Sequence, residues 1–227
     1  MKKGVISGDI VAFTSLSKKN KELVEMHIQE LLEALRTNFG CYARLVKGDY
    51  LECVVPRPEE TLKVALLIKS KIKSIPILRD KENDHRTSYF ENYGIRLAIG
   101  YGSLQRFDTE KGIIDGEAIY MSGRKINEED THTMDRISIK NTLFFVSKDE
   151  NLNESMEPML LLLDFLMNKT TAKQSQVLYY KLLGNNEEAI AKKLGVSQPA
   201  INQHSNGAGW NAIEHAVQYF HKTLKNQ

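Results

Sequence analysis

The chain contains little cysteine, proline or tryptophan: two Cys, five Pro and one Trp among 227 residues. Two cysteines cannot form the multiple-disulfide framework that stabilises small secreted proteins. Cys41 and Cys53 each lie in an apolar run that is typical of a strand. We therefore expect two buried thiols in the reducing environment of the cytoplasm.

Long apolar runs and a strong charge of one sign are also missing. The longest run, residues 159–167, contains Asp164 and is far shorter than the roughly 20 residues that span a bilayer. No membrane partner is therefore expected. The formal net charge of +2 is too small to indicate nucleic-acid binding by itself.

Apolar periodicity predicts alternating strands and helices up to about residue 150. A strand at 4–14 precedes an amphipathic helix that is capped by Ser17 and ends at Gly40. Two apolar runs, 41–46 and 50–55, are joined by Lys47-Gly48-Asp49, which is typical of a tight hairpin. Then follow a helix at 59–75, a polar stretch at 79–92 that predicts an exposed loop, a strand at 95–104, a helix from about 116 and a strand at 141–147.

This order of elements predicts an α+β fold of the ferredoxin-like type, with two helices on one face of a mostly antiparallel sheet. After residue 149 the pattern contains only helices. We therefore predict two domains, an α+β domain over 1–150 and an all-helical domain over 151–227.

Within the second domain, the segment NNEEAIAKKLGVSQPAINQHS has the spacing of a helix-turn-helix. Gly195 permits the turn, Val196 packs into the angle, Ser197 caps the second helix and Ile201 faces inward. The alternative is a helical hairpin that serves only packing or dimerisation. If the segment binds DNA as a helix-turn-helix, the residues expected to contact the DNA are Lys192, Lys193, Ser197, Gln198, Asn202, Gln203 and Asn206.

The charge of this domain favours readout by amides over electrostatic attraction. Residues 151–227 contain seven lysines and six acidic residues, so their non-specific affinity for DNA is expected to be modest.

Two carboxylates interrupt apolar, β-prone stretches in the first domain: Asp9 in GDIVAFTSLS and Asp49 in LVKGDYLECVV. An unpaired carboxylate inside a sheet is costly, so two of them predict a shared divalent cation, Mg²⁺ or Mn²⁺. The alternatives are local roles: Asp9 as a cap of the loop after the strand, and Asp49 as an ordinary hairpin-turn residue.

With both Gly-Asp stretches placed, residues 1–150 resemble the class III nucleotidyl cyclase fold. GDIVAFT matches the first metal motif, with Ala12 in place of the usual Gly, and Gly48-Asp49 matches the second. The resemblance implies that Asp9 and Asp49 hold two cations on a nucleotide triphosphate, and that Arg124 in GIIDGEAIYMSGRKI contacts the phosphates or stabilises the transition state. The base-reading lysine of the family is replaced by Leu45, and its asparagine one turn before the arginine by Tyr120.

Nearly the whole chain resembles the SatD family, through GDIVAFTSLS, KGDYLECVV, IDGEAIYMSGR and the helix-turn-helix. Tyr50 and Leu51 stand where that family usually has Glu and Phe. The resemblance implies a cyclase-like domain followed by a DNA-binding unit.

Three functions remain open at this point. The first is a homodimeric DNA-binding regulator whose cyclase-like domain dimerises and can bind a nucleotide with its metal. The second is a metal-dependent nucleotidyl cyclase or phosphotransferase with an accessory helical domain. The third is an interaction protein with both sites vestigial. Leu45 and Tyr120 replace residues of the cyclase family, so they favour the first function, in which the protein does not catalyse a reaction.

Overall fold

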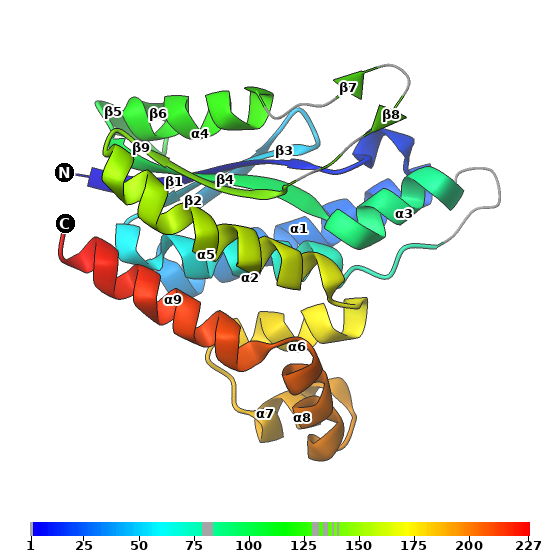
Figure 1. Ribbon diagram of the computed structural model, residues 1–227. Coiled ribbons are helices and arrows are strands. Elements are labelled where there is room, and N and C mark those ends of the chain that lie inside the picture. Colours follow the sequence, from blue (N-terminus) through cyan, green and yellow to red (C-terminus); the bar gives the residue numbers. More distant parts are fainter. Residues whose placement is uncertain (1, 79–83, 129–131, 134–135, 138, 140) are drawn as a thin grey trace.

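The computed structural model describes residues 2–78, 84–128, 132–133, 136–137, 139 and 141–227. Its centre is a five-stranded sheet in the order β2-β3-β1-β4-β9 (Figure 1). Neighbouring strands are antiparallel except β4 and β9, which are parallel. The strands are β1 (Lys2–Ile10), β2 (Tyr42–Val46), β3 (Tyr50–Val55), β4 (Ile95–Ser103) and β9 (Leu143–Ser147).

The strands β2-β3-β1-β4 with their connecting helices have the ferredoxin-like order, which confirms the predicted fold class. Helices α1 (Lys18–Phe39) and α2 (Thr61–Lys73) cover one face of the sheet, and α4 (Glu117–Glu128) covers the other (Figure 1). Strand alternation assigns Ile6 and Ile10 of β1 to the α1–α2 core. Ser7 faces α4, where its Oγ lies 2.7 Å from the Oγ of Ser122.

Local signals predicted several boundaries correctly. The Oγ of Ser17 accepts a hydrogen bond from the backbone N–H of Asn20 at 3.3 Å, and α1 ends at Gly40 with φ 64°. The hairpin between β2 and β3 turns through Lys47 and Gly48, whose φ values of 54° and 86° lie in the left-handed region.

The loop predicted at 79–92 is wrong for its second part, because α3 spans Asp84–Tyr93. Residues 79–83 lie outside the described residues. Between residues 86 and 93, the part of α3 whose side chains the structure describes, Thr87 and Phe90 are buried, so the sequence of this segment carries no apolar periodicity. Two small hairpins were also not predicted: β5 (Arg106–Asp108) with β6 (Ile113–Asp115), and β7 (His132–Thr133) with β8 (Arg136–Ile137).

Five helices follow β9: α5 (Glu150–Lys169), α6 (Ala172–Leu182), α7 (Glu187–Leu194), α8 (Gln198–Gly207) and α9 (Trp210–Lys225). Side chains from α5, α6 and α9, such as Leu160, Leu178 and Phe220, belong to the same hydrophobic core as the sheet. Only α7 and α8 form a separate small cluster, with Val177 and Tyr180 of α6. The domain boundary at residue 150 stays a prediction, and the hydrophobic packing is continuous across it.

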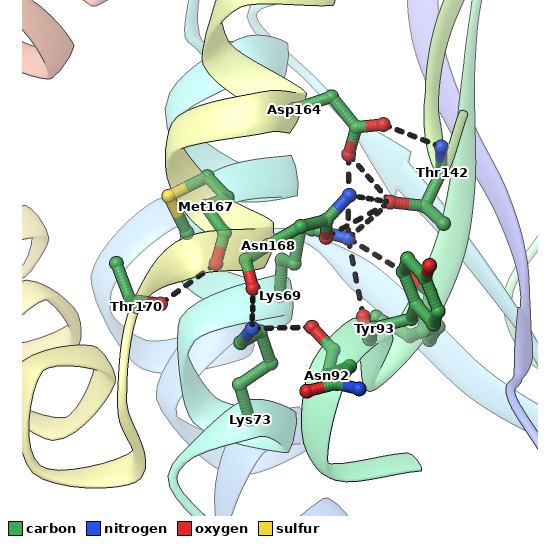
Figure 2. Close-up of polar contacts among 10 residues, drawn as sticks. Lys69, Lys73, Asn92, Tyr93, Thr142, Asp164, Met167, Asn168 and Thr170 are labelled. Atoms are coloured by element: carbon green, nitrogen blue, oxygen red, sulfur yellow. Dashed lines mark hydrogen bonds and ion pairs between the residues drawn. The ribbon is translucent and has the colours of Figure 1, made fainter. Parts of the chain in front are cut away.

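A buried polar network joins α2 to the start of β9 and to α5 (Figure 2). The Lys69 side chain is fully buried, and its Nζ donates to Thr142 Oγ1 at 2.6 Å and to the carbonyls of Tyr93 and Ile95 at 3.2 Å each. Its ion-pair partner is Asp164, whose Oδ1 lies 3.5 Å away. Asp164 Oδ2 also accepts from the backbone N–H of Thr142 at 2.6 Å, so the carboxylate is held from two sides.

A second buried lysine, Lys73, lies one turn further along α2 (Figure 2). Its Nζ donates to the carbonyls of Asn92 at 2.5 Å and Asn168 at 3.1 Å, linking the ends of α3 and α5. Burial lowers the pKa of Lys69. Burial first, and the neighbouring Lys69 charge second, lower the pKa of Lys73 to about 7.

Candidate functional site

Asp9 lies near the end of β1 and is bound by an arginine from the adjacent strand. The register of β1 and β4 pairs Asp9 with Arg96. The guanidinium donates from Nε to Oδ1 at 2.9 Å and from Nη2 to Oδ2 at 2.7 Å, a bidentate ion pair. The Arg96 side chain is only 8% exposed. The sequence signal for Arg96 was a charged residue between Ile95 and Leu97 of an apolar strand, and sequence reasoning missed it.

Asp49 lies in the turn between β2 and β3. Its carbonyl accepts a hydrogen bond of 2.9 Å from the backbone N–H of Ile10, which fastens the hairpin to the end of β1. The sheet register pairs Asp9 with Tyr50. The structure therefore brings the backbones of the two Gly-Asp stretches together at one end of neighbouring strands.

The residues around Asp9 do not fit a resident Mg²⁺ or Mn²⁺ as they stand. Both carboxylate oxygens already accept from Arg96, so a divalent cation would have to displace a buried guanidinium and overcome its charge. Within the described part of the chain, no group of three or more His, Cys, Asp or Glu side chains is arranged to hold a metal ion. The metal role of Asp9 and Asp49 stays a prediction, and we derive no chemistry through a metal.

Arg124 is exposed on α4 and lines a pocket of about 530 Å³ between α4 and β3. Tyr50, Tyr120 and Asn127 line the same pocket. No ion-pair partner of Arg124 occurs among the described residues. The pocket thus offers one guanidinium and two phenol rings to a ligand.

Acidic residues in the lining make this pocket less favourable for a triphosphate than Arg124 alone would make it. Glu52 and Glu128 also line it, although Glu52 is ion-paired with Arg44 at 2.6 Å. Tyr120, in the position of the family's asparagine, is 63% exposed and donates its Oη to Asp115 Oδ1 at 2.5 Å. That hydrogen bond raises the pKa of Tyr120, so its hydroxyl stays neutral near pH 7.

The predicted pair of helices in the C-terminal part is present. Helix α7 ends at Gly195, whose φ is 66°, and α8 begins three residues later. Ile190 and Ile201 are fully buried in their small cluster. Val196 was predicted to pack into the angle; this is wrong, because it is 47% exposed and Leu194 packs against the cluster in its place.

The outer face of α8 carries a row of hydrogen-bonded side chains. The Glu187 carboxylate of α7 accepts from Gln198 Nε2 at 3.2 Å and from Asn202 Nδ2 at 3.3 Å. Asn206 Nδ2 donates to Asn202 Oδ1 at 3.0 Å. All residues predicted to contact DNA are exposed: Lys192, Lys193, Ser197, Gln198, Asn202, Gln203 and Asn206.

Glu187 is the residue of this face that sequence reasoning missed. Lys181 lies 3.1 Å from its carboxylate. Partial burial opposes ionisation of Glu187, but the hydrogen bonds from Lys181 and Asn202 prevail and lower its pKa. Glu187 is therefore an anion at neutral pH that orients the amides of α8. Its sequence signal was weak, an acidic residue in the first turn of a helix.

The two lysines of α7 differ in their surroundings. Lys193 Nζ lies 4.8 Å from the centroid of the Tyr180 ring, so the side chain is turned toward α6. Lys192 is exposed and has no ion-pair partner among the described residues.

No family profile and no curated protein matches the chain. Several solved structures are similar to it. A bacterial light-regulated adenylyl cyclase is 15% identical over 64% of this chain and 43% of its own length, with a TM-score of 0.40. The dimeric guanylyl cyclase domain of a fusion protein from the aquatic fungus Blastocladiella emersonii is 20% identical over 56% of this chain and 73% of its own, with a TM-score of 0.37. An adenylyl cyclase from P. aeruginosa is 15% identical over 56% and 71%, with a TM-score of 0.36.

These similar structures are all nucleotidyl cyclases, the family that the N-terminal motifs resemble. With identities and scores this low, the description of the fold rests on the strand order, and no activity follows from the similarity. No described helix combines the length and the apolar character that crossing a bilayer requires.

Proposed function

We propose that this protein is a sequence-specific DNA-binding regulator that uses α7 and α8 to contact the major groove. The observation that carries the proposal is the exposed row of amide side chains on α8, held in place by Glu187. Side chains fixed in this way lose little conformational entropy when they bind. A regulator of this architecture is also what the SatD resemblance implies.

The chemistry of the row suits adenine. An Asn or Gln amide can pair with adenine through two hydrogen bonds: its amino group donates to N7, and its carbonyl oxygen accepts from the N6 amino group. Gln203 is exposed and has no hydrogen-bond partner among the described residues, so its amide is available for such a pair. Lys192 and Lys193 precede the turn, where lysines can contact phosphates, which fix position but carry no sequence information. Lys192 is available as it stands, whereas Lys193 would have to leave the ring of Tyr180.

Glu187 should make the proposed DNA binding selective for particular base sequences. An anion inside the reading face repels phosphate oxygens, so it weakens binding to DNA in general. It can also accept a hydrogen bond from the N4 amino group of cytosine. Binding should therefore depend on base contacts to an unusual degree for a domain with so little net charge.

The proposal includes a homodimer. In helix-turn-helix dimers, each subunit commonly reads one of two DNA half-sites, and the centres of the half-sites lie about 34 Å apart. A second copy would double the contacts and compensate for the small charge of one unit.

Selection from a random DNA pool, followed by fluorescence anisotropy on the selected site, tests the proposal. Asn202→Ala or Gln203→Ala should cost about 1–3 kcal/mol on the selected site and leave random DNA nearly unaffected. Lys193→Ala should weaken all sequences alike and lower the salt slope by about one. Lys225→Ala, an exposed lysine at the end of α9, is the matched control and should bind as the parent does. Failure of the parent to bind any DNA at low salt would overturn the proposal.

A second candidate function is nucleotide binding in the pocket at Arg124. It rests on a guanidinium without a described partner beside two tyrosines. ATP or GTP, with and without Mg²⁺, should then raise the melting temperature, and Arg124→Ala should abolish the rise. Catalysis by a metal-dependent cyclase or phosphotransferase is the weaker alternative, because Arg96 occupies the Asp9 carboxylate and Leu45 and Tyr120 replace family residues. Cyclic nucleotide formed from ATP or GTP would establish it.

A further inference from the structure

Helix α5 is apolar on both sides. Its inner side buries Met156, Leu160, Leu163 and Met167 in the core. Its outer side exposes Leu161, Leu162 and Phe165, which are 41%, 68% and 61% exposed. In Figure 1 this helix lies at the front of the molecule, between the sheet and α9. Adjacent exposed apolar side chains on one helix indicate a surface that a partner covers.

We infer that the outer face of α5 is a homodimer interface, in which α5 packs antiparallel against α5 of a second copy. Six exposed residues of this face have a spacing that reads the same in both directions: Glu154, Pro158, Leu161, Leu162, Phe165 and Lys169. Asn151, in the first turn of α5, is exposed on the same side. At 3.6 residues per turn, these positions lie within about 100° of the helix circumference.

The symmetric spacing makes this face complementary to itself. A two-fold axis between Leu161 and Leu162 places Leu161 opposite Leu162 of the partner subunit. The same axis places Pro158 opposite Phe165 of the partner subunit. At both ends it places Glu154 opposite Lys169 of the partner subunit, so each end of the interface gains an ion pair.

The charges at the two ends of this face favour antiparallel packing of two copies over parallel packing. A parallel pair would place Glu154 beside its own equivalent and Lys169 beside its own, and like charges at an interface are costly. Lys169 Nζ lies 5.5 Å from the centroid of the Phe165 ring, which holds the ammonium on the apolar face. Glu154 has no ion-pair partner among the described residues, so it is available to the second copy.

This interface does not depend on DNA binding, so it is tested on the full chain without DNA. Sedimentation velocity over a range of concentrations should show a dimer. Leu162→Lys combined with Phe165→Lys should yield a monomer, and both positions are exposed, so the melting temperature of the monomer should change little. Met26→Lys, at an apolar α1 residue that is 51% exposed, is the matched control and should remain dimeric.

Charge reversal tests the register itself. Lys169→Glu and Glu154→Lys should each weaken the dimer by about tenfold or more, because each creates two like-charge pairs. The double variant Glu154→Lys/Lys169→Glu should restore the affinity of the parent. A monomeric parent would overturn the inference. A dimer that survives the two lysine substitutions on the apolar face, or a double variant as weak as the single ones, would overturn it equally.

Discussion

The buried pair of Lys69 and Asp164 gives the sharpest test of how this fold is held together. Both side chains are almost fully buried, at 0% and 3% exposed, and they join α2 to α5 through Thr142. We consider Lys69→Met, Asp164→Asn and the double variant. Methionine has nearly the length of lysine without its charge, and asparagine keeps an acceptor for the backbone N–H of Thr142.

Each single variant leaves one buried charge without its partner. Removing one member of a buried ion pair typically costs about 3–5 kcal/mol of the free energy of unfolding. In Lys69→Met the Asp164 carboxylate keeps its hydrogen bonds to Thr142 but loses its ion-pair partner, Lys69 (Figure 2). The carbonyls of Tyr93 and Ile95 also lose a donor, which adds to the cost.

The double variant contains no unpaired charge at this position. We therefore expect its loss to be smaller than the sum of the two single losses, by about 2–3 kcal/mol. Urea denaturation followed by circular dichroism measures all four proteins at pH 7. Losses that add to within about 0.5 kcal/mol would show that the two charges are not coupled, and would refute the reasoning.

The pH dependence of Asp164→Asn is a second readout of the same pair. Without the carboxylate, burial of Lys69 is uncompensated and its folded-state pKa, already lowered, falls further. The unfolded chain then binds more protons than the folded one above that pKa. The stability of the variant should therefore rise more steeply between neutral and alkaline pH than that of the parent, up to the pKa of lysine in the unfolded chain.

Three shorter predictions concern other parts of the molecule. The pKa of Lys73 is lowered to about 7 in the folded protein from its ordinary value of 10.5, so between these pH values the unfolded chain binds more protons than the folded one. The stability of the parent should therefore rise with pH in this range. Lys73→Met should flatten that rise in urea titrations at different pH values. Asp9→Asn should lower the free energy of unfolding by about 1–3 kcal/mol, because the charged hydrogen bonds to Arg96 are lost. Mg²⁺ or Mn²⁺ alone should leave the melting temperature of the parent unchanged. A metal-induced rise in melting temperature that Asp9→Asn removes would instead establish a metal site. Ile201→Ala should cost about 2–5 kcal/mol and raise hydrogen exchange in α7 and α8 but not in β1 and β4, because its cluster is separate from the core; uniform loss of protection would contradict this.

Local sequence signals predicted most of the elements because each was determined by neighbouring residues. Ser17 and Gly40 delimit α1, and Gly48 permits the hairpin, through conformations that depend on a few adjacent positions. Helix α3 was missed because its stability comes from contacts of a few side chains such as Phe90 with the rest of the molecule.

The partners of charged residues could not be predicted in the same way. Asp9 and Arg96 meet only because β1 and β4 are adjacent, and this depends on the register of the whole sheet. Lys69 directly follows the apolar run 64–68, and Asp164 interrupts the apolar run 159–167. The sequence does not reveal that they share Thr142. An intruding charge in an apolar element therefore indicates a buried partner, but not which one.

Helix α6 contributes side chains to the main hydrophobic core and also to the small cluster of α7 and α8. Leu178 and Leu182 pack in the core of the sheet, while Val177 and Tyr180 pack against Ile190 and Ile201. The orientation of α8 is thus set by rigid packing and not by a flexible tether. In the DNA-bound dimer that we propose, the two α8 helices would therefore keep a constant separation and a constant angle about the axis of the DNA. One extra base pair between half-sites rotates the second by about 34°, and a rigid protein cannot follow that rotation. Operators for this protein should therefore tolerate base changes between the half-sites far better than a change in their spacing.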